Sequence, residues 1–190
     1  MRSLLCVPIS VHTKADAIAD AELARAQGAS LIEFRMDHVM EAGGVDACVA
    51  LSRGLCEASP LPVIMTCRST SEGGVFGGEL GDLEAWTRAM LDSTAPHPPR
   101  YVDVEFAALG RSGVLRSLVH EHEDPSRPGV ILSSHDFSGP PRDLSRRLLA
   151  MAQTGGVDVI KIAYAARSLR DALAVLALPE ELGRPTIAVG

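Results

Sequence analysis

The 190-residue sequence has no excess of positive charge and no long apolar run, and each absence excludes a class of protein. The formal net charge is -6, so no basic stripe is available to hold the phosphates of a nucleic acid. No apolar run reaches the roughly 20 residues that span a bilayer. We therefore expect neither a nucleic-acid partner nor a membrane association.

Cysteine is also scarce, with four residues in the chain: Cys6, Cys48, Cys56 and Cys67. None belongs to a C-x-x-C pair, so the pattern does not favour a metal site. Reduced structural thiols in a cytoplasmic protein are the better interpretation. The short apolar run at the N-terminus stops at Pro8 and lacks a signal-peptide cleavage pattern, so we interpret it as a first strand.

The sequence contains a regular alternation of strand-like and helix-like segments. Of its residues, 46% are hydrophobic and 22% are charged. No linker, low-complexity segment or repeat divides it, so we expect one domain over residues 1–190. The predicted strands are 4–9, 31–35, 63–68, 101–106, 130–135, 157–163 and 186–189. The predicted helices are 14–27, 45–57, 83–93, 114–122, 144–154 and 168–178. Strict alternation of this kind indicates a parallel sheet with right-handed crossovers.

Two architectures satisfy this alternation, an open doubly wound sheet and a (β/α)₈ barrel. Strands of an open sheet are apolar on both faces, whereas inward and outward residues alternate along barrel strands. Polar residues alternate with apolar ones near the ends of successive strands: Glu33, Arg35 and Asp37; Thr66 and Arg68; Asp103 and Glu105; Ser133 and His135; and Lys161. Polar groups at the C-terminal ends of strands are typical of the catalytic face of a barrel. We therefore predict an α/β protein with a (β/α)₈ barrel fold, of which about seven strands are present.

Lys161 stands in the most apolar of these strands, between Ile160 and Ile162. A lysine at the end of a strand can reach solvent with its charged head. Alternatively, it is a desolvated amine that forms a Schiff base with a carbonyl substrate. The similar polar positions on the earlier strands favour the second interpretation.

The motifs occur in a specific order along the chain. They are Glu33-Phe34-Arg35-Met36-Asp37, Thr66-Cys67-Arg68-Ser69-Thr70-Ser71-Glu72-Gly73-Gly74, Asp103-Val104-Glu105, Ser133-Ser134-His135-Asp136-Phe137 and Lys161-Ile162-Ala163. Together they resemble the type I 3-dehydroquinate dehydratases, Schiff-base enzymes of the shikimate pathway. The resemblance runs over nearly the whole chain, and it implies conversion of 3-dehydroquinate to 3-dehydroshikimate.

The resemblance also implies roles for the reacting residues. Lys161 corresponds to the lysine that forms the imine, so no cofactor is expected, and no metal. His135 corresponds to the general base that later acts as an acid, and Glu72 to the carboxylate that orients this histidine. The chemistry is consistent, because a protonated imine is an electron sink that acidifies the neighbouring carbon.

Further residues fall at the binding positions of the family. Glu33, Arg35 and Arg68 match residues that contact the substrate hydroxyls. We expect Asp103 and Glu105 to balance the cations, and Ser133 to supply a hydroxyl to the ligand or the backbone. The glycine pairs at 73–74 and 77–78 are either hinges of a mobile loop or plain turns.

The sequence departs from the family at its end, because the polar groups that hold the substrate carboxylate after strands seven and eight are not present up to Gly190. We expect a C-terminally incomplete barrel domain that is weakly active or inactive alone, and a cytoplasmic homodimer at full length. The alternatives are another class I Schiff-base lyase or aldolase, and a non-catalytic fragment that binds a small polyol acid or a partner chain.

Overall fold

The computed structural model describes residues 4–92, 94–120, 126–182 and 185–189. Strands and helices alternate through these residues, and the pairings of β1 with β2, β2 with β3, β3 with β4, β5 with β6 and β6 with β7 are parallel. The chain divides into two compact units, residues 1–103 with 124–128, and residues 104–123 with 129–190. Each unit is described by itself below.

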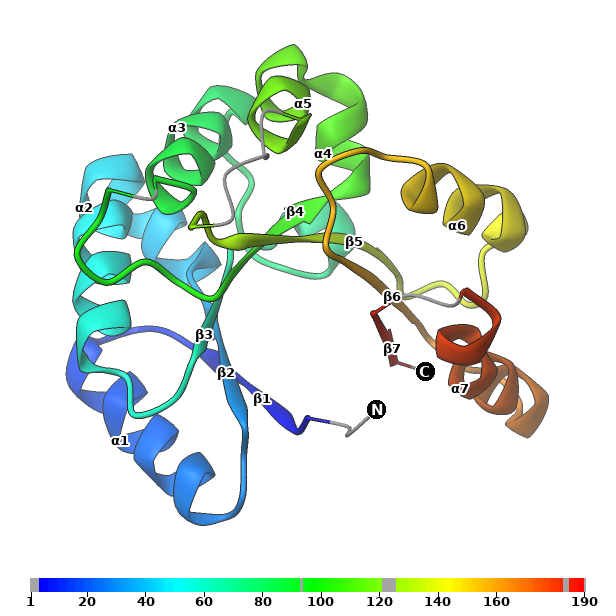
Figure 1. Ribbon diagram of the computed structural model, residues 1–190, viewed down its shortest axis with the longest axis horizontal. Coiled ribbons are helices and arrows are strands. Elements are labelled where there is room, and N and C mark those ends of the chain that lie inside the picture. Colours follow the sequence, from blue (N-terminus) through cyan, green and yellow to red (C-terminus); the bar gives the residue numbers. More distant parts are fainter. Residues whose placement is uncertain (1–3, 93, 121–125, 183–184, 190) are drawn as a thin grey trace. The chain divides into compact units, whose positions relative to one another are not determined.

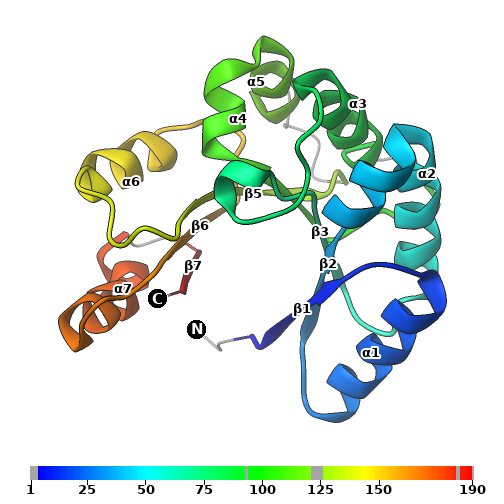
Figure 2. The same cartoon turned by 180° about the vertical axis from the view of Figure 1, so that it is seen from behind.

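The first unit contains four parallel strands and three long helices. The strands are β1 (Cys6–Ser10), β2 (Leu31–Arg35), β3 (Val63–Thr66) and the first three residues of β4 (Tyr101–Glu105). The helices are α1 (Lys14–Ala26), α2 (Asp37–Ala58) and α3 (Leu80–Met90), with a short 3-10 turn, η1 (Thr70–Glu72), after β3. Figure 1 and the view from behind in Figure 2 show α1, α2 and α3 along the same side of the strands. The opposite side of these strands therefore carries none of these three helices.

Local signals explain where the helices of this unit begin and end. The Thr13 hydroxyl accepts a hydrogen bond from the Asp16 amide at 3.2 Å and caps the start of α1. Gly28 follows this helix with φ 96°, the left-handed conformation expected of a C-terminal glycine. Helix α2 begins eight residues before the predicted start at 45, and only Gly44, with φ 72°, is non-helical inside it.

The strands of the first unit are in a register that aligns their polar residues. Ser10 is opposite Arg35, Arg35 is opposite Thr66, and Thr66 is opposite Asp103. Because side chains on adjacent parallel strands share a face when their residues are in register, these pairs form a row across the sheet.

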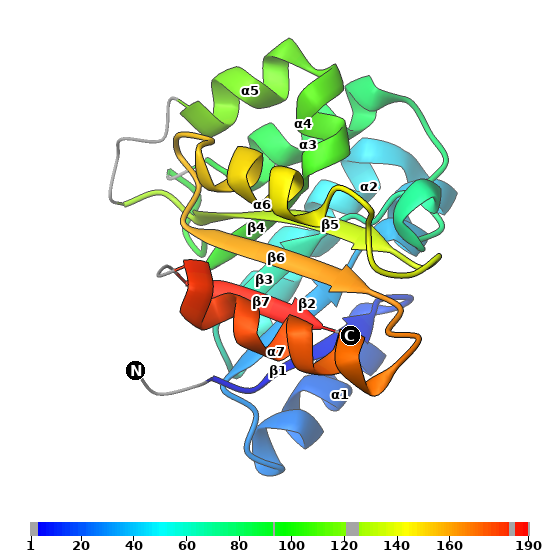
Figure 3. The same ribbon diagram turned by 90° about the vertical axis from the view of Figure 1, so that its right-hand side faces the viewer.

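The second unit contains strands β5 (Gly129–Asp136), β6 (Val159–Tyr164) and β7 (Thr186–Val189), with helices α4 (Phe106–Arg111), α5 (Gly113–His120), α6 (Leu144–Ala152) and α7 (Leu169–Leu182). Figure 3 shows α6 and α7 in front of these strands. Helix α4 was not predicted, and Phe106 begins this helix rather than ending a strand. Positions 93 and 121–122, the ends of two predicted helices, lie outside the described residues.

No helix in the described part of the chain combines the length and the apolar character needed to cross a membrane. Buried side chains in each unit are mostly aliphatic, and Trp86 of α3 is the largest that is fully buried. The Trp86 indole N–H donates to the Ser52 hydroxyl of α2 at 3.2 Å, so this buried polar group is satisfied.

Candidate functional site

The polar row of the first unit lies at the C-terminal ends of β2, β3 and β4. Glu33 and Arg35 are two apart on β2 and therefore share a face, which the register extends to Thr66. The Thr66 hydroxyl donates to Glu33 Oε1 at 2.8 Å. Thr66 was not predicted as a site residue; its contact depends on the pairing of β2 with β3.

Arg68 is a buried cation held by two buried carboxylates. Its guanidinium is 3.0 Å from Asp103 Oδ1 and 3.5 Å from Glu72 Oε2. The side chain of Arg68 is 2% exposed and that of Asp103 is 1% exposed. Because a buried charge is tolerated only when it is paired, this arrangement fixes the position of the guanidinium. Asp103 thus contacts the guanidinium of Arg68 directly.

Glu72 lies in η1, on a turn that follows β3 directly. The Phe76 amide donates to the Arg68 carbonyl at 3.3 Å, and the Gly74 amide donates to the Ser69 carbonyl at 2.8 Å. Gly73 has φ 81°, and a Cβ at Gly74 would overlap the backbone of Arg68. Both glycines are therefore required by a tight turn, which favours the plain turn over the hinge.

Arg35 is held by Asp37, a residue of the predicted catalytic face for which no individual role was predicted. Asp37 accepts from Arg35 Nε at 2.7 Å and from Arg35 Nη2 at 2.8 Å, a two-pronged contact of the kind that orients a guanidinium. Asp37 was grouped with the strand residues, but it is the first residue of α2. The sequence signal for this ion pair was an aspartate two residues after an arginine, at the start of a helix.

Lys161 lies in the second unit, in the middle of β6, and is 7% exposed. The interpretation of a strand-end lysine that reaches solvent is therefore wrong. Lys161 is in register with Ser133 on β5, and His135 is in register with Ala163. These four residues share one face of the β5–β6 pair, with His135 about 6–7 Å farther along the strands than Lys161.

The other face of β5 is turned toward α6. Ser134 alternates with Ser133 and His135, and its hydroxyl accepts from Arg147 of α6 at 3.0 Å. Ser133 is fully buried, whereas His135 is partly exposed. The face with Lys161 is therefore the one away from α6, and it brings an amine, an imidazole and a hydroxyl together. Glu105, the last residue of β4, is buried in this unit immediately before α4.

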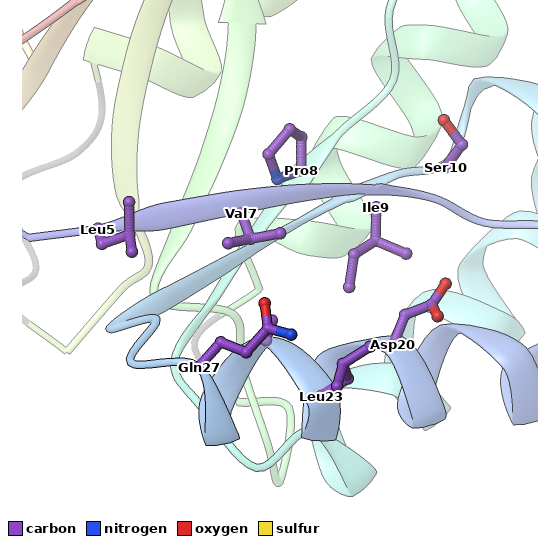
Figure 4. Close-up of a pocket in the computed structure, with 9 residues that line it drawn as sticks. Leu5, Val7, Pro8, Ile9, Ser10, Asp20, Leu23 and Gln27 are labelled. Atoms are coloured by element: carbon purple, nitrogen blue, oxygen red, sulfur yellow. The ribbon is translucent and has the colours of Figure 1, made fainter.

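A separate hollow of about 490 Å³ lies between β1 and α1 in the first unit. Figure 4 shows Val7 and Ile9 of β1 and Leu23 and Gln27 of α1 around it. No predicted site residue lines this hollow. Within the described residues, no three His, Cys, Asp or Glu side chains gather as a metal site requires.

Comparisons with known proteins identify the family of the chain. Residues 5–190 match the type I 3-dehydroquinase family. The 3-dehydroquinate dehydratase of Methanothrix thermoacetophila is 31% identical over 176 residues, which cover 93% of this chain and 69% of that protein.

Solved structures give the fold. The 3-dehydroquinate dehydratase of Geobacillus kaustophilus superposes with a TM-score of 0.78 at 23% identity, over 98% of this chain and 72% of that one. The type I enzyme of Clostridium difficile, solved with covalently modified comenic acid, gives a TM-score of 0.76 at 26% identity, over 98% of this chain and 74% of that one. The predicted α/β fold of the (β/α)₈ barrel class is confirmed by this likeness. By its sequence match and its fold, the chain belongs to the type I 3-dehydroquinase family, whose members are hydro-lyases of the shikimate pathway.

Proposed function

We propose that the protein dehydrates 3-dehydroquinate through an imine on Lys161, without a separate cofactor. The observation that carries this proposal is the position of Lys161, buried in β6 and in register with Ser133, with His135 on the same face. A lysine removed from water is more readily neutral, and a neutral amine is the nucleophile that attacks a ketone. Membership of the type I family supplies the substrate and the reaction class.

The reaction follows from these groups in a balanced sequence. The Lys161 amine adds to the ketone carbon, and loss of water leaves a protonated imine. His135 removes a proton from the carbon beside the imine, and the electron pair moves into the imine to form an enamine. The enamine expels the β-hydroxyl group, which leaves as water with the proton that His135 returns. Hydrolysis of the resulting imine then releases the enone and restores the amine of Lys161.

The residues of the first unit have binding roles in this proposal. Glu33, Arg35 and Arg68 contact the substrate hydroxyls, and the fixed geometry of the two guanidinium groups supports this assignment. Glu72 is the carboxylate that orients His135, an assignment that rests on the resemblance to the family. Ser133 offers its hydroxyl beside Lys161, and Asp103 and Glu105 balance the cations. The finer properties that we propose are a cytoplasmic location and a homodimeric assembly, again from the resemblance.

The experiment is to trap the imine. The protein is incubated with 3-dehydroquinate, reduced with borohydride and weighed intact by mass spectrometry. We expect one covalent adduct on the native chain and on a Lys14→Ala control, which removes an exposed lysine of α1, and none on Lys161→Ala. An equal adduct on Lys161→Ala would contradict the assignment. His135→Ala is expected to keep the adduct but lose dehydration, since imine formation does not need the base that removes the carbon-bound proton.

A further inference from the structure

Asp37 contacts more than Arg35. Its Oδ2 atom also accepts a hydrogen bond from the backbone N–H of Val75 at 3.2 Å, and its side chain is 1% exposed. Val75 belongs to the turn after β3, residues 69–77, which we name the β3 turn. A single carboxylate at the start of α2 therefore joins the arginine at the end of β2 to this turn.

A second carboxylate repeats the contact one helical turn later. Glu41 Oε2 accepts from the backbone N–H of Gly77 at 2.9 Å. Residues four apart on a helix are neighbours about 5–6 Å apart, and alternate residues of an extended chain are separated by about 6–7 Å. The two acceptors on α2 thus match two donors at alternate positions of the β3 turn, which indicates a built contact rather than one chance hydrogen bond.

Internal hydrogen bonds join the two sides of the β3 turn to each other. Thr70 N–H donates to the Phe76 carbonyl at 2.9 Å, and Phe76 N–H donates back to Arg68 at 3.3 Å. Between these anchor points lies Glu72, which is buried and contacts Arg68. Fixing Val75 therefore limits where the Glu72 carboxylate and the Arg68 guanidinium can lie.

The charge state of Asp37 suits this contact. Burial alone raises the pKa of this carboxyl, but the hydrogen bonds and charge of Arg35, together with backbone amides that include Val75, more than offset it, so the pKa is lowered. Asp37 is therefore ionised at neutral pH. Only the ionised carboxylate can accept from Arg35 with one oxygen and from both Arg35 and Val75 with the other.

We propose that Asp37 is a positioning residue of the dehydratase reaction, which holds the Arg35 guanidinium and the β3 turn in one arrangement. This rests on the proposed function, in which Arg35 and Arg68 contact substrate and Glu72 supports catalysis. The Asp37 side chain is 1% exposed, and it acts through the groups that it holds. Two of the five N–H groups of Arg35 are occupied by Asp37, and the remaining N–H groups keep a fixed direction for a hydroxyl ligand.

The test compares Asp37→Asn with Asp46→Asn. Asn keeps the size of Asp but replaces one acceptor oxygen with an amide that cannot accept from Arg35 or Val75. Asp46 is exposed on the same helix, so its substitution removes the same charge from α2. Glu41→Gln changes the exposed second contact, to Gly77, and is a milder variant that tests the attachment of the β3 turn to α2 if Asp37→Asn fails to fold.

Two measurements are made on the whole protein. Hydrogen–deuterium exchange of the peptide that contains Val75 is expected to be faster in Asp37→Asn, and slightly faster in Glu41→Gln, than in the native chain and Asp46→Asn. In steady-state kinetics with 3-dehydroquinate, we expect kcat/KM of Asp37→Asn to fall by about 10²-fold, with KM raised and kcat lowered, because small misplacements of binding groups reduce both orientation and affinity. A purely structural role would lower the active fraction and leave KM unchanged.

The outcomes separate this inference from the proposed function. If hydrogen–deuterium exchange of the β3 turn is as slow in Asp37→Asn as in the native chain, the contact of Asp37 with Val75 does not hold the turn, and the inference is overturned. Faster exchange with an unchanged KM overturns the positioning role. If the native protein binds or dehydrates no 3-dehydroquinate, the proposed function and the positioning role fail together, while the exchange measurement still decides whether Asp37 holds the turn.

Discussion

Replacement of Arg68 by methionine should destabilise the protein strongly. The Arg68 guanidinium lies 3.0 Å from Asp103 and 3.5 Å from Glu72, with all three side chains at most 7% exposed. Methionine fills a similar length but removes the cation that both carboxylates contact. Breaking a buried ion pair on one side typically costs about 3–5 kcal/mol, because the remaining charge stays desolvated. This is a large part of the roughly 5–15 kcal/mol that stabilises an ordinary domain.

Urea unfolding followed by tryptophan fluorescence measures this cost. Trp86 is the only tryptophan and is fully buried in the unit that contains Arg68. With a urea slope of about 2 kcal/mol/M, we expect the unfolding midpoint of Arg68→Met to fall by roughly 2 M. Arg88→Met, at an exposed position on α3, is the matched control and should change stability by less than about 0.5 kcal/mol.

One outcome would refute this reasoning. If Arg68→Met lowers the free energy of unfolding by less than about 1 kcal/mol at pH 7, the buried charges are not the reason for the pairing.

Two further predictions concern the second unit and the thiols. Gly156→Ala should lower the free energy of unfolding by at least about 1–3 kcal/mol, because φ is 74° and the new Cβ would overlap the Val119 carbonyl. The control Gly81→Ala lies in open space on α3 and should raise the free energy of unfolding by about 0.5–1 kcal/mol. Equal effects of the two substitutions, measured by chemical denaturation, would contradict this prediction. Burial raises the pKa of Cys48 and of Cys56 to about 12, so roughly one thiol in 10⁴ is ionised at pH 8 and neither should be alkylated in the native chain, as peptide mass mapping would show. Rapid alkylation of either thiol would mean that α2, which carries both cysteines, opens readily.

The accuracy of the predicted elements depended on how local their signals are. Strands β2 and β7 occupy the residues predicted for them, because β-branched and apolar runs mark them without ambiguity. The start of α2 was predicted too late, at residue 45, whereas the helix begins at Asp37. The structure places only Gly44 outside helical geometry and continues the helix on both sides. Helix α4 has only six residues, too few for a helical period to be recognised.

The chemistry of the site was more predictable than its contacts. Alternation along one strand predicted that Ser133 and His135 share a face. That Ser133 lies beside Lys161 follows instead from the register of β5 with β6, which the pattern along a single strand does not determine. The contacts of Asp37 were not predicted for a related reason: in the sequence it continues the alternation of β2, whereas in the structure the chain has already turned into α2. Its partner Val75 is 38 residues away, so no local rule connects them.

Pro8 has a consequence for the outer edge of β1. Among the described strands, β1 pairs with β2 alone, and the backbones of Leu5 and Val11 bond toward β2. Because backbone groups alternate in direction along a strand, those of residues 6, 8 and 10 point the other way. Pro8 has no N–H, so a strand that lies along this edge receives no amide donor from the middle of β1. One residue thereby limits the hydrogen bonds that any neighbouring strand can form on this side of β1.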